Sequence, residues 1–358
     1  MGYEIDFLPV GDGGRGGDAI ALRYGNLHGS RNEQTVVIID GGNQDSGQEL
    51  VDHVQERYDT DVVDLVVCTH PDSDHSSGLS VVLEQLEVKR LWMHRPWKHA
   101  GKISDAFVDD DITNDGLSEL LQESLKHACK LEELADEKGI PISEPFSDGA
   151  SSTRFPEIRV LGPSRDYYRE LLPEFGDMPM TKSITGVFGR LTEAVKAVAE
   201  RWNWETLTEP VEDTRAENNS SAILLLQVDG RNLLFTGDAG VPALEHAADF
   251  AEAQGVDLKS CVLQQVPHHG SKRNVGPSIL NRIVGPIGSA SGSKSVVVSV
   301  PKKGDPKHPA KKVTNAYQRR GANVTVTKGE VICSPYNAPT RLGWGPATPV
   351  PFYSEVEE

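Results

Sequence analysis

Short apolar runs that end in Gly, Asp or His recur toward both ends of the chain. Runs of this length, bounded by turn-forming residues, are typical of buried strands. They predict strands at 35–39, 62–68, 91–93, 159–162, 223–226, 232–235, 262–266 and 296–300. Helical spacing of apolar residues predicts helices over 47–57, 117–137 and 186–202, with Gly139 and Pro141 ending the second and an acidic loop over 205–217 following the third. Interspersed strands and helices indicate an α/β protein.

The organisation along the chain follows these elements. Residues 3–75 and 219–335 share a strand, turn and polar-cluster pattern, and the stretch between them is less regular. At 358 residues the chain is long enough to bury a large core. We therefore expect a single domain over 1–358 with an insertion at about 85–215, which could cover a functional site or bind a protein partner.

A polar cluster directly after the strand at 62–68 is the main candidate for chemistry. Four of its side chains can bind metals, namely His70, Asp72, Asp74 and His75. Neutral nitrogen and anionic oxygen ligands together suit one or two divalent cations. The alternative is a polar turn that caps a buried strand. We favour the metal site, because chance rarely places two His and two Asp at this spacing.

Three further strands end in candidate ligands. Asp238 follows the strand at 232–235 through Gly237, Asp40 follows the strand at 35–39, and His268 and His269 follow the strand at 262–266. Adjacent side chains in an extended segment point to opposite faces. We therefore expect one of the two histidines to bind metal, and we favour His268. The other would support the metal ligand or face the substrate.

The motifs HPDSDH, NNSSAILLL, LLFTGDAG and VPHHGSK, in this order, resemble the metallo-β-lactamase fold hydrolases of the HxDxDH branch. Within them, they resemble the soluble hydrolase domain of ComEC-type DNA-uptake proteins. The resemblance implies an αββα four-layer sandwich with mixed sheets and an inserted helical segment. It also implies a metal site of His70 and Asp72, a second site of Asp74 and His75, and a bridging Asp238, with Asp40 orienting a ligand from behind.

One family ligand is missing. The His that usually precedes the Gly-Asp strand has no counterpart in residues 217–226. The resemblance implies a metal-dependent phosphodiesterase, plausibly a nuclease, and it identifies no substrate.

The candidate ligands also support this chemistry by themselves. Two divalent ions, Zn²⁺ or Mn²⁺, would lower the pKa of a shared water to about 7 and hold phosphoryl oxygens. Asp74, Asp238 and His308 are the candidate catalytic residues. Three aspartates would offset most of the charge of two divalent ions and leave about +1, which favours an anionic substrate.

Candidate substrate contacts lie beside the ligand motifs. They are Asn219, Ser221, Ser271, Lys272 and His308. Each has a structural alternative, since Asn and Ser are common in turns and exposed loops need no ligand. Trp92 is expected in the core, and any base stacking is expected from Trp97 rather than Trp92.

Charge and composition bear on which partners and which compartment to expect. The net charge of −17 excludes a globally basic nucleic-acid binder, although residues 294–328 are locally basic and could guide a polyanion. Four scattered cysteines read as reduced core residues, and no signal or membrane-spanning run is present, so a cytoplasmic protein is the simplest expectation.

Other functions stay open. The substrate class is expected to be nucleic acid or nucleotide. One alternative is hydrolysis of another ester, an amide or a thioester, because one fold serves many chemistries. The other is a catalytically weak interaction module in a multiprotein system, such as a defence system, that binds its partner through the insertion.

Overall fold

Two large β-sheets form the centre of the molecule. The computed structural model describes residues 1–13, 16–103, 113–149, 154–176, 197–289, 294–305 and 307–357. The first sheet has seven strands in the order β16-β1-β2-β3-β5-β7-β8, and the second has six in the order β15-β14-β13-β12-β11-β9. Both sheets are mixed, with parallel pairing from β3 to β8 and from β12 to β15.

The first sheet contains β1 (Gly2–Phe7), β2 (Ala19–Gly25), β3 (Gln34–Gly41), β5 (Leu65–Val67), β7 (Leu91–Trp92), β8 (Ile142–Ser143) and β16 (Ile332–Tyr336). The second contains β9 (Ile158–Gly162), β11 (Ile223–Val228), β12 (Arg231–Phe235), β13 (Leu263–Gln265), β14 (Lys294–Val298) and β15 (Ala322–Val326). Two small sheets pair β4 (Val62–Val63) with β6 (Glu87–Val88) and β10 (Ala197–Ala199) with β17 (Glu355–Glu357).

The α-helices are α1 (Gln44–Tyr58), α2 (Ser73–Gln85), α3 (Ala100–Ile103), α4 (Asn114–Ser124), α5 (Lys126–Lys138), α6 (Arg165–Leu171), α7 (Ala216–Asn219), α8 (Val241–Ala253), α9 (Pro277–Ile283) and α10 (Lys311–Arg319). Short 3-10 helices are η1 (Arg31–Glu33), η2 (Pro96–His99), η4 (Leu172–Glu174), η5 (Leu258–Ser260) and η6 (Pro267–Gly270).

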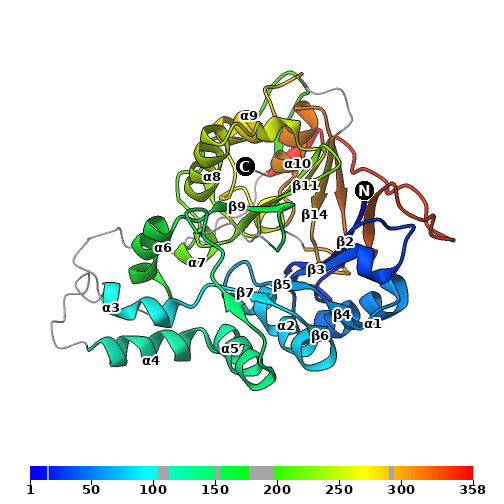
Figure 1. The fold of residues 1–358 in the computed structure, drawn as a ribbon. Coiled ribbons are helices and arrows are strands. Elements are labelled where there is room, and N and C mark those ends of the chain that lie inside the picture. Colours follow the sequence, from blue (N-terminus) through cyan, green and yellow to red (C-terminus); the bar gives the residue numbers. More distant parts are fainter. Residues whose placement is uncertain are drawn as a thin grey trace.

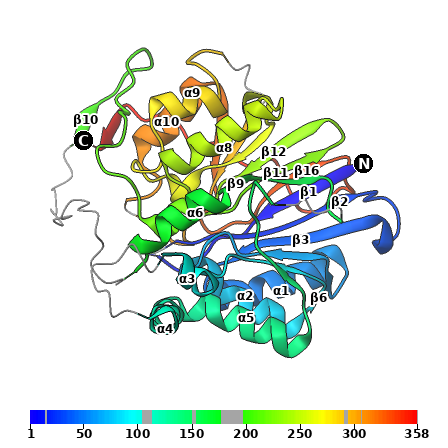
Figure 2. The same ribbon diagram turned by 60° about the vertical axis from the view of Figure 1, so that its left-hand side comes forward.

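The layers follow from which faces of the sheets are apolar. One buried cluster, including Phe7, Leu224 and Phe235, joins the inner faces of the two sheets. A second cluster joins the outer face of the first sheet to α1, α2 and α5, and a third joins the second sheet to α8, α9 and α10. Figures 1 and 2 show these helices on the outer sides of the paired sheets. The αββα four-layer sandwich expected from the sequence is confirmed.

Several predicted elements differ in detail. The strand at 62–68 is split at Asp64, whose carboxylate accepts a hydrogen bond from the Val36 backbone N–H at 2.9 Å. The helix predicted over 117–137 is wrong as one element, because Leu125 leaves helical geometry between α4 and α5 (φ −111°, ψ 35°). The helix predicted over 186–202 lies partly outside the described residues, and it does not extend to 202 because β10 is a strand.

The segment predicted as an insertion also contributes to the sandwich. Within 85–215, β7 and β8 extend the first sheet, β9 forms one edge of the second, and α5 packs on α2. The remaining helices of this range, α3, α4 and α6, gather at one end of the molecule (Figure 1). The assignment of 1–358 as one domain stays a prediction.

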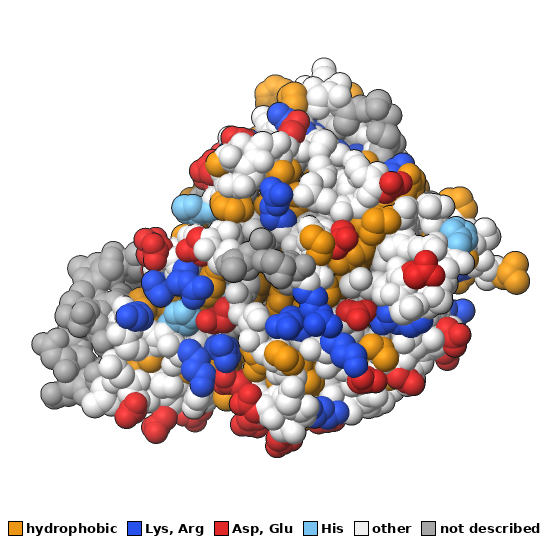
Figure 3. Space-filling model, in the orientation of Figure 1, with side chains coloured by type: hydrophobic (Ala, Val, Ile, Leu, Met, Phe, Trp, Pro, Cys, Tyr) orange, Lys and Arg blue, Asp and Glu red, His pale blue; other side chains and the backbone are white. Residues whose placement is uncertain are grey.

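The surface distributes charge unevenly. On the face drawn in Figure 3, Lys and Arg side chains gather across the middle, while Asp and Glu concentrate along the lower edge. All four cysteines are free. None of the helices in the described part of the chain combines the length and apolar character needed to cross a bilayer.

Candidate metal centre

Loops at the carboxyl ends of parallel strands bring the predicted ligands together. In the first sheet, Asp40 is the penultimate residue of β3, and β5 leads into the loop of His70 to His75, where α2 begins. In the second, β12 leads to Asp238 and β13 to the His268–His269 pair. Neighbouring parallel strands end at the same sheet edge. Four separate segments therefore meet between the two sheets.

The carboxylate of Asp238 is the centre of this cluster. Its Oδ2 lies 3.9 Å from His70 Nε2 and 3.6 Å from His268 Nε2. Its Oδ1 lies 3.4 Å from His75 Nε2 and 3.8 Å from His269 Nε2. Each carboxylate oxygen thus faces two imidazole nitrogens, which is the arrangement that a bridging ligand between two cations would have.

The two adjacent histidines do not alternate as the sequence predicts. His268 and His269 both have positive φ angles, 47° and 54°, so the segment is not extended. Two left-handed residues turn both rings toward Asp238, so the two side chains do not point to opposite faces. Which of the two binds metal stays a prediction. Gly270 follows with φ 81°, and a Cβ there would come within 2.6 Å of Pro309.

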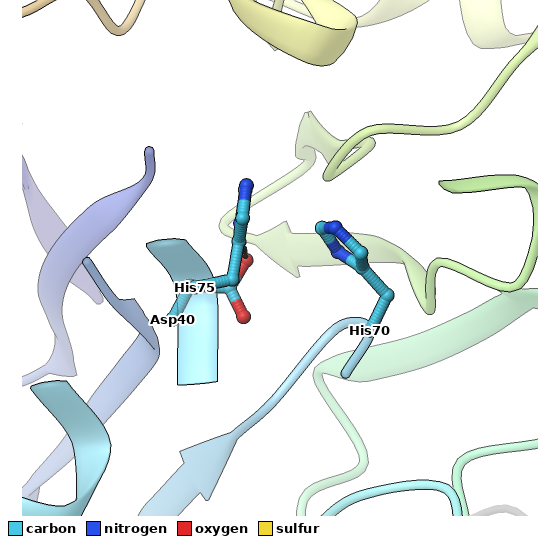
Figure 4. Close-up of side chains that lie close together, drawn as sticks. All are labelled: Asp40, His70 and His75. Carbon is cyan, nitrogen blue, oxygen red and sulfur yellow. Dashed lines mark hydrogen bonds and ion pairs between the residues drawn. The ribbon is translucent and has the colours of Figure 1, made fainter. Parts of the chain in front are cut away.

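Asp40 orients the first of the two loops. Its Oδ2 accepts from His75 Nδ1 at 2.8 Å and from Thr69 Oγ1 at 2.6 Å, and its Oδ1 accepts from the Thr69 backbone N–H at 2.7 Å. Figure 4 shows Asp40 behind His75, whose ring extends away from the carboxylate, with His70 alongside. A proton on Nδ1 leaves the Nε2 lone pair of His75 available for a cation.

The amides and hydroxyls near the Gly-Asp strand hold the loops in place. Ser221 Oγ accepts from the Asp238 backbone N–H at 3.1 Å, and Asn219 Oδ1 accepts from the Gly240 N–H at 3.0 Å. Both side chains are buried, and Asn219 ends the short helix α7 rather than opening a strand. These contacts agree with the structural alternative for the two residues.

Sequence reasoning missed Asp18 as part of the centre. This buried carboxylate groups with Asp238 and His269, with ligand atoms within 4.8 Å of one another, and its Oδ2 lies 3.8 Å from His75 Nδ1. Gln265 Nε2 donates to it at 2.7 Å. The preceding Gly17 lies tightly against the first loop, because a Cβ there would come within 2.1 Å of the Asp74 carbonyl oxygen, but no spacing in the sequence shows this contact.

Sequence reasoning also missed Asn274 and Arg215. Asn274 Nδ2 donates to the Asp238 carbonyl at 2.8 Å, and its Oδ1 lies 3.1 Å from His268 Nδ1. Arg215 forms an ion pair with Asp72. The Oδ2 of Asp72 also lies 3.9 Å from His70 Nε2. Neither residue belongs to a motif that marks a metal site.

The remaining candidates lie at the edge of the cluster. The His308 ring stacks on His268 with centroids 6.2 Å apart, and Ser271 is buried in the turn, where its Oγ accepts from the Arg273 N–H at 3.2 Å. Lys272 is exposed. Trp97 is buried and donates from Nε1 to Glu132 at 2.6 Å, so its ring is not exposed for base stacking. Trp92 is buried in the core, as expected.

Burial and the surrounding carboxylates set the pKa values of these groups. Burial lowers the pKa of His75, but Asp238 and Asp40 outweigh it and raise that pKa well above its usual value. For Asp238, burial raises the pKa, but His268 and His75 outweigh it and hold it well below its usual range. Burial lowers the pKa of His308 to about 4. His308 is therefore a neutral imidazole at physiological pH.

The donor set fits divalent metal ions. Four buried ligand atoms have no hydrogen-bond partner: His70 Nε2, His75 Nε2, His269 Nε2 and Asp238 Oδ1. Buried polar atoms without partners are costly and call for an explanation. Imidazole nitrogens suit Zn²⁺, and added carboxylates extend the choice to Mn²⁺. The cluster thus has the chemistry of a metal centre.

One protein-family model matches part of the chain. Residues 30–145 match the sequence model described as the metallo-beta-lactamase superfamily, which is roughly a third of the chain. No curated protein matches. Among solved structures, a putative metallo-beta-lactamase from Thermotoga maritima is 13% identical over 71% of this chain and 93% of its own, with a TM-score of 0.33.

Two other solved structures are similar to the chain. A diphosphatase of the PhnP family is 11% identical over 94% of this chain and 98% of its own, with a TM-score of 0.36. The metallo-beta-lactamase SMB-1 is 12% identical over 74% and 79%, with a TM-score of 0.29. The family match is confined to residues 30–145, and the described residues fold into an αββα four-layer sandwich.

Proposed function

We propose that this protein is a metal-dependent hydrolase of phosphodiesters, with nucleic acid or nucleotides as its substrates. The observation that carries the proposal is the Asp238 carboxylate with two imidazole nitrogens facing each of its oxygens. Two divalent ions bound there would supply an activated water and stabilise charge on phosphoryl oxygens. The resemblance to the ComEC-type hydrolase domain supports the same reaction class.

The charge of the centre supports an anionic substrate. Asp18 joins Asp72, Asp74 and Asp238, so four carboxylates would balance two divalent ions. Arg215 beside Asp72 adds one positive charge. With both ions bound, the sum is about +1, which can balance the negative charge of a bound phosphodiester.

The surrounding side chains have separate roles in this proposal. Asp40 fixes the ring of His75, and Asn274 fixes the ring of His268. Asp74 groups with His75 and His269 and is less buried than either, so it can position a water at the edge of the cluster. His308, neutral at physiological pH, can donate a hydrogen bond to a phosphoryl or leaving oxygen beside His268.

A chromogenic phosphodiester assay tests the proposal. We expect bis(p-nitrophenyl) phosphate to be hydrolysed in the presence of Mn²⁺ or Zn²⁺. Asp238→Asn and Asp74→Ala should each lower the rate by about 100-fold or more, because each removes a ligand of the metal centre. Asp229→Asn, in the turn between β11 and β12, is the matched control and should keep full activity.

The outcomes separate the alternative functions. Labelled single-stranded and double-stranded DNA, RNA and dinucleotides would define the substrate. Activity on carboxylic esters or thioesters without activity on phosphodiesters would favour the other hydrolases of this fold. A protein that binds no metal and co-purifies with a stoichiometric partner would contradict the proposal and favour the interaction module.

A further inference from the structure

Asp238 divides the ligand atoms of the centre into two sets. The inner set comprises Asp238 Oδ1, His75 Nε2 and His269 Nε2, with the carboxylates of Asp18 and Asp74. The outer set comprises Asp238 Oδ2, His70 Nε2, His268 Nε2 and Asp72 Oδ2. The two sets share one side chain but differ in burial, in compactness and in the charges next to them.

The inner set is compact and mostly buried. Asp74, His75 and His269 form one group whose ligand atoms lie within 4.8 Å of one another, and Asp18, Asp238 and His269 form another. All of these side chains except Asp74 are buried. Asp238 Oδ1, His75 Nε2 and His269 Nε2 have no hydrogen-bond partner. Anionic oxygens and free imidazole nitrogens in a buried space form a site prepared for a cation.

The outer set is more open and less compact. The Asp72 and His268 side chains are 16% and 30% exposed. Of the groups of three ligand atoms within 4.8 Å that the described residues form, none includes Asp72 or His268. His70 Nε2 lies 3.9 Å from both Asp72 Oδ2 and Asp238 Oδ2. A cation there would need the outer residues to move closer together.

A positive side chain already pairs with the outer carboxylate. The Arg215 guanidinium forms an ion pair with Asp72 Oδ2, the oxygen that faces His70. Arginine is always charged, so it competes with a divalent cation for this oxygen and also repels the cation. The outer carboxylate is therefore paired with a charge that cannot be removed by loss of a proton, unlike the charge of an imidazolium.

Arg215 can also leave this position without disturbing the core. Its side chain is 63% exposed, and the residue immediately precedes the short helix α7. A planar guanidinium binds phosphate oxygens through two parallel hydrogen bonds. When an anionic phosphodiester binds at the centre, the Arg215 guanidinium can thus pair with its phosphate oxygens and release Asp72.

We propose that the two sets fill in order. The inner set binds a divalent ion in the free protein, while Arg215 keeps the outer set from binding one until a phosphodiester anion draws the guanidinium away from Asp72. This inference rests on the proposed function, and it names Arg215 as a positioning residue that couples substrate binding to the second ion.

Metal stoichiometry tests the order directly. After metal removal and equilibrium dialysis against one fixed, buffered free concentration of Zn²⁺ or Mn²⁺, elemental analysis should find about one ion per chain in the wild type and about two in Arg215→Ala. Saturating dimethyl phosphate, a phosphodiester anion with a poor leaving group, should raise the wild type toward two. With Mn²⁺, electron paramagnetic resonance should change from an isolated-ion to a coupled-pair spectrum in the same samples.

The chain offers a matched control for the substitution. Arg273 is also 63% exposed and pairs with Glu212, which is not a candidate ligand. Arg273→Ala should keep about one ion per chain. Circular dichroism would confirm that each variant is folded.

The outcomes distinguish this inference from the proposed function. Two ions bound with equal affinity in the wild type, one ion in Arg215→Ala, or one ion in the wild type with dimethyl phosphate would each overturn the order of filling and leave the hydrolase proposal standing. No bound ion in any variant would contradict both.

Discussion

Asp40 connects three groups of the metal centre without being one of the proposed metal ligands. Its two oxygens accept from the Thr69 backbone, the Thr69 hydroxyl and His75 Nδ1. Its own backbone has φ 55°, a left-handed conformation that Asp and Asn adopt more readily than most residues. Asparagine is therefore compatible with the backbone at this position and changes only the acceptor chemistry.

We expect Asp40→Asn to weaken divalent metal binding by about 10- to 100-fold. The substituted amide has one acceptor oxygen for three donors, so either Thr69 or His75 loses its partner and the ring of His75 is no longer fixed. Competition titration with a Zn²⁺ chelator measures the change. Asp59→Asn is the control, because Asp59 also has a left-handed φ of 52° but caps α1. Unchanged affinity in Asp40→Asn would show that packing alone orients His75.

Single residues were predicted from the sequence where one local motif contains them. The cluster from His70 to His75 and the Gly237–Asp238 pair could be found because a strand followed by ligands is a local pattern. Asp18 could not, since its role depends on the contact of one sheet's loop with the other. The joint orientation of His268 and His269 depends on two positive φ angles that no spacing rule predicts.

At the scale of elements, α1 and α2 pack through glycines directly behind the metal centre. A Cβ on Gly78 of α2 would come within 2.0 Å of the Gly41 carbonyl oxygen, and one on Gly47 of α1 within 2.2 Å of the Gly78 carbonyl oxygen. The Gly78 N–H donates to the Gly42 carbonyl at 2.9 Å. This close contact sets how α2 presents His75 at its first turn.

Gly78→Ala should therefore lower the free energy of unfolding. Overpacking a core typically costs about 1–3 kcal/mol, and we expect at least that much here. The helix propensity of alanine would offset about 1 kcal/mol of the steric cost. Urea unfolding followed by circular dichroism measures the difference. Gly345→Ala is the control, because nothing lies within 4 Å of a Cβ there. A Gly78→Ala variant as stable as the wild type would mean that α2 can move away from the connection between β3 and α1 without loss.

The end of a helix was predictable where residues that stop helices follow it. Gly139 ends α5 in a left-handed conformation, as the sequence predicts. The break at Leu125 has no such signal, because leucine favours helices and the interruption arises from how α4 and α5 pack against the rest of the fold. Tertiary packing overrides local propensity there.

At the scale of the whole molecule, the two ends of the sequence meet on the first sheet. Strand β16 pairs with β1, and Arg341, in the segment after β16, donates to both oxygens of Asp6 at 2.8 Å. The family resemblance carried by the motifs implied the sandwich. It could not predict this closure, since neither Asp6 nor Arg341 belongs to a motif and their partnership spans nearly the whole chain.

The Asp6 contact has a consequence for acid stability. Burial raises the pKa of Asp6, but hydrogen bonds from His53 and Arg341 outweigh it and hold the pKa well below its usual range. An aspartate whose folded-state pKa is depressed stabilises the fold above its unfolded pKa of about 4. That contribution is lost as the pH falls from about 4 toward the folded-state pKa.

Arg341→Met should lower stability at pH 7 and flatten its loss in acid. Breaking a buried ion pair costs about 3–5 kcal/mol, and we expect the lower end or less because His53 and Tyr58 still contact Asp6. The folded-state pKa of Asp6 then rises, so less stability remains to be lost below pH 4 or so. Urea unfolding from pH 7 to 3 measures both effects, with the exposed-pair variant Lys89→Met as control. If the free energy of unfolding fell with pH in parallel for Arg341→Met and the wild type, His53 and Tyr58 alone would depress the Asp6 pKa. Arg341 would then connect the two chain ends without contributing to the loss of stability in acid.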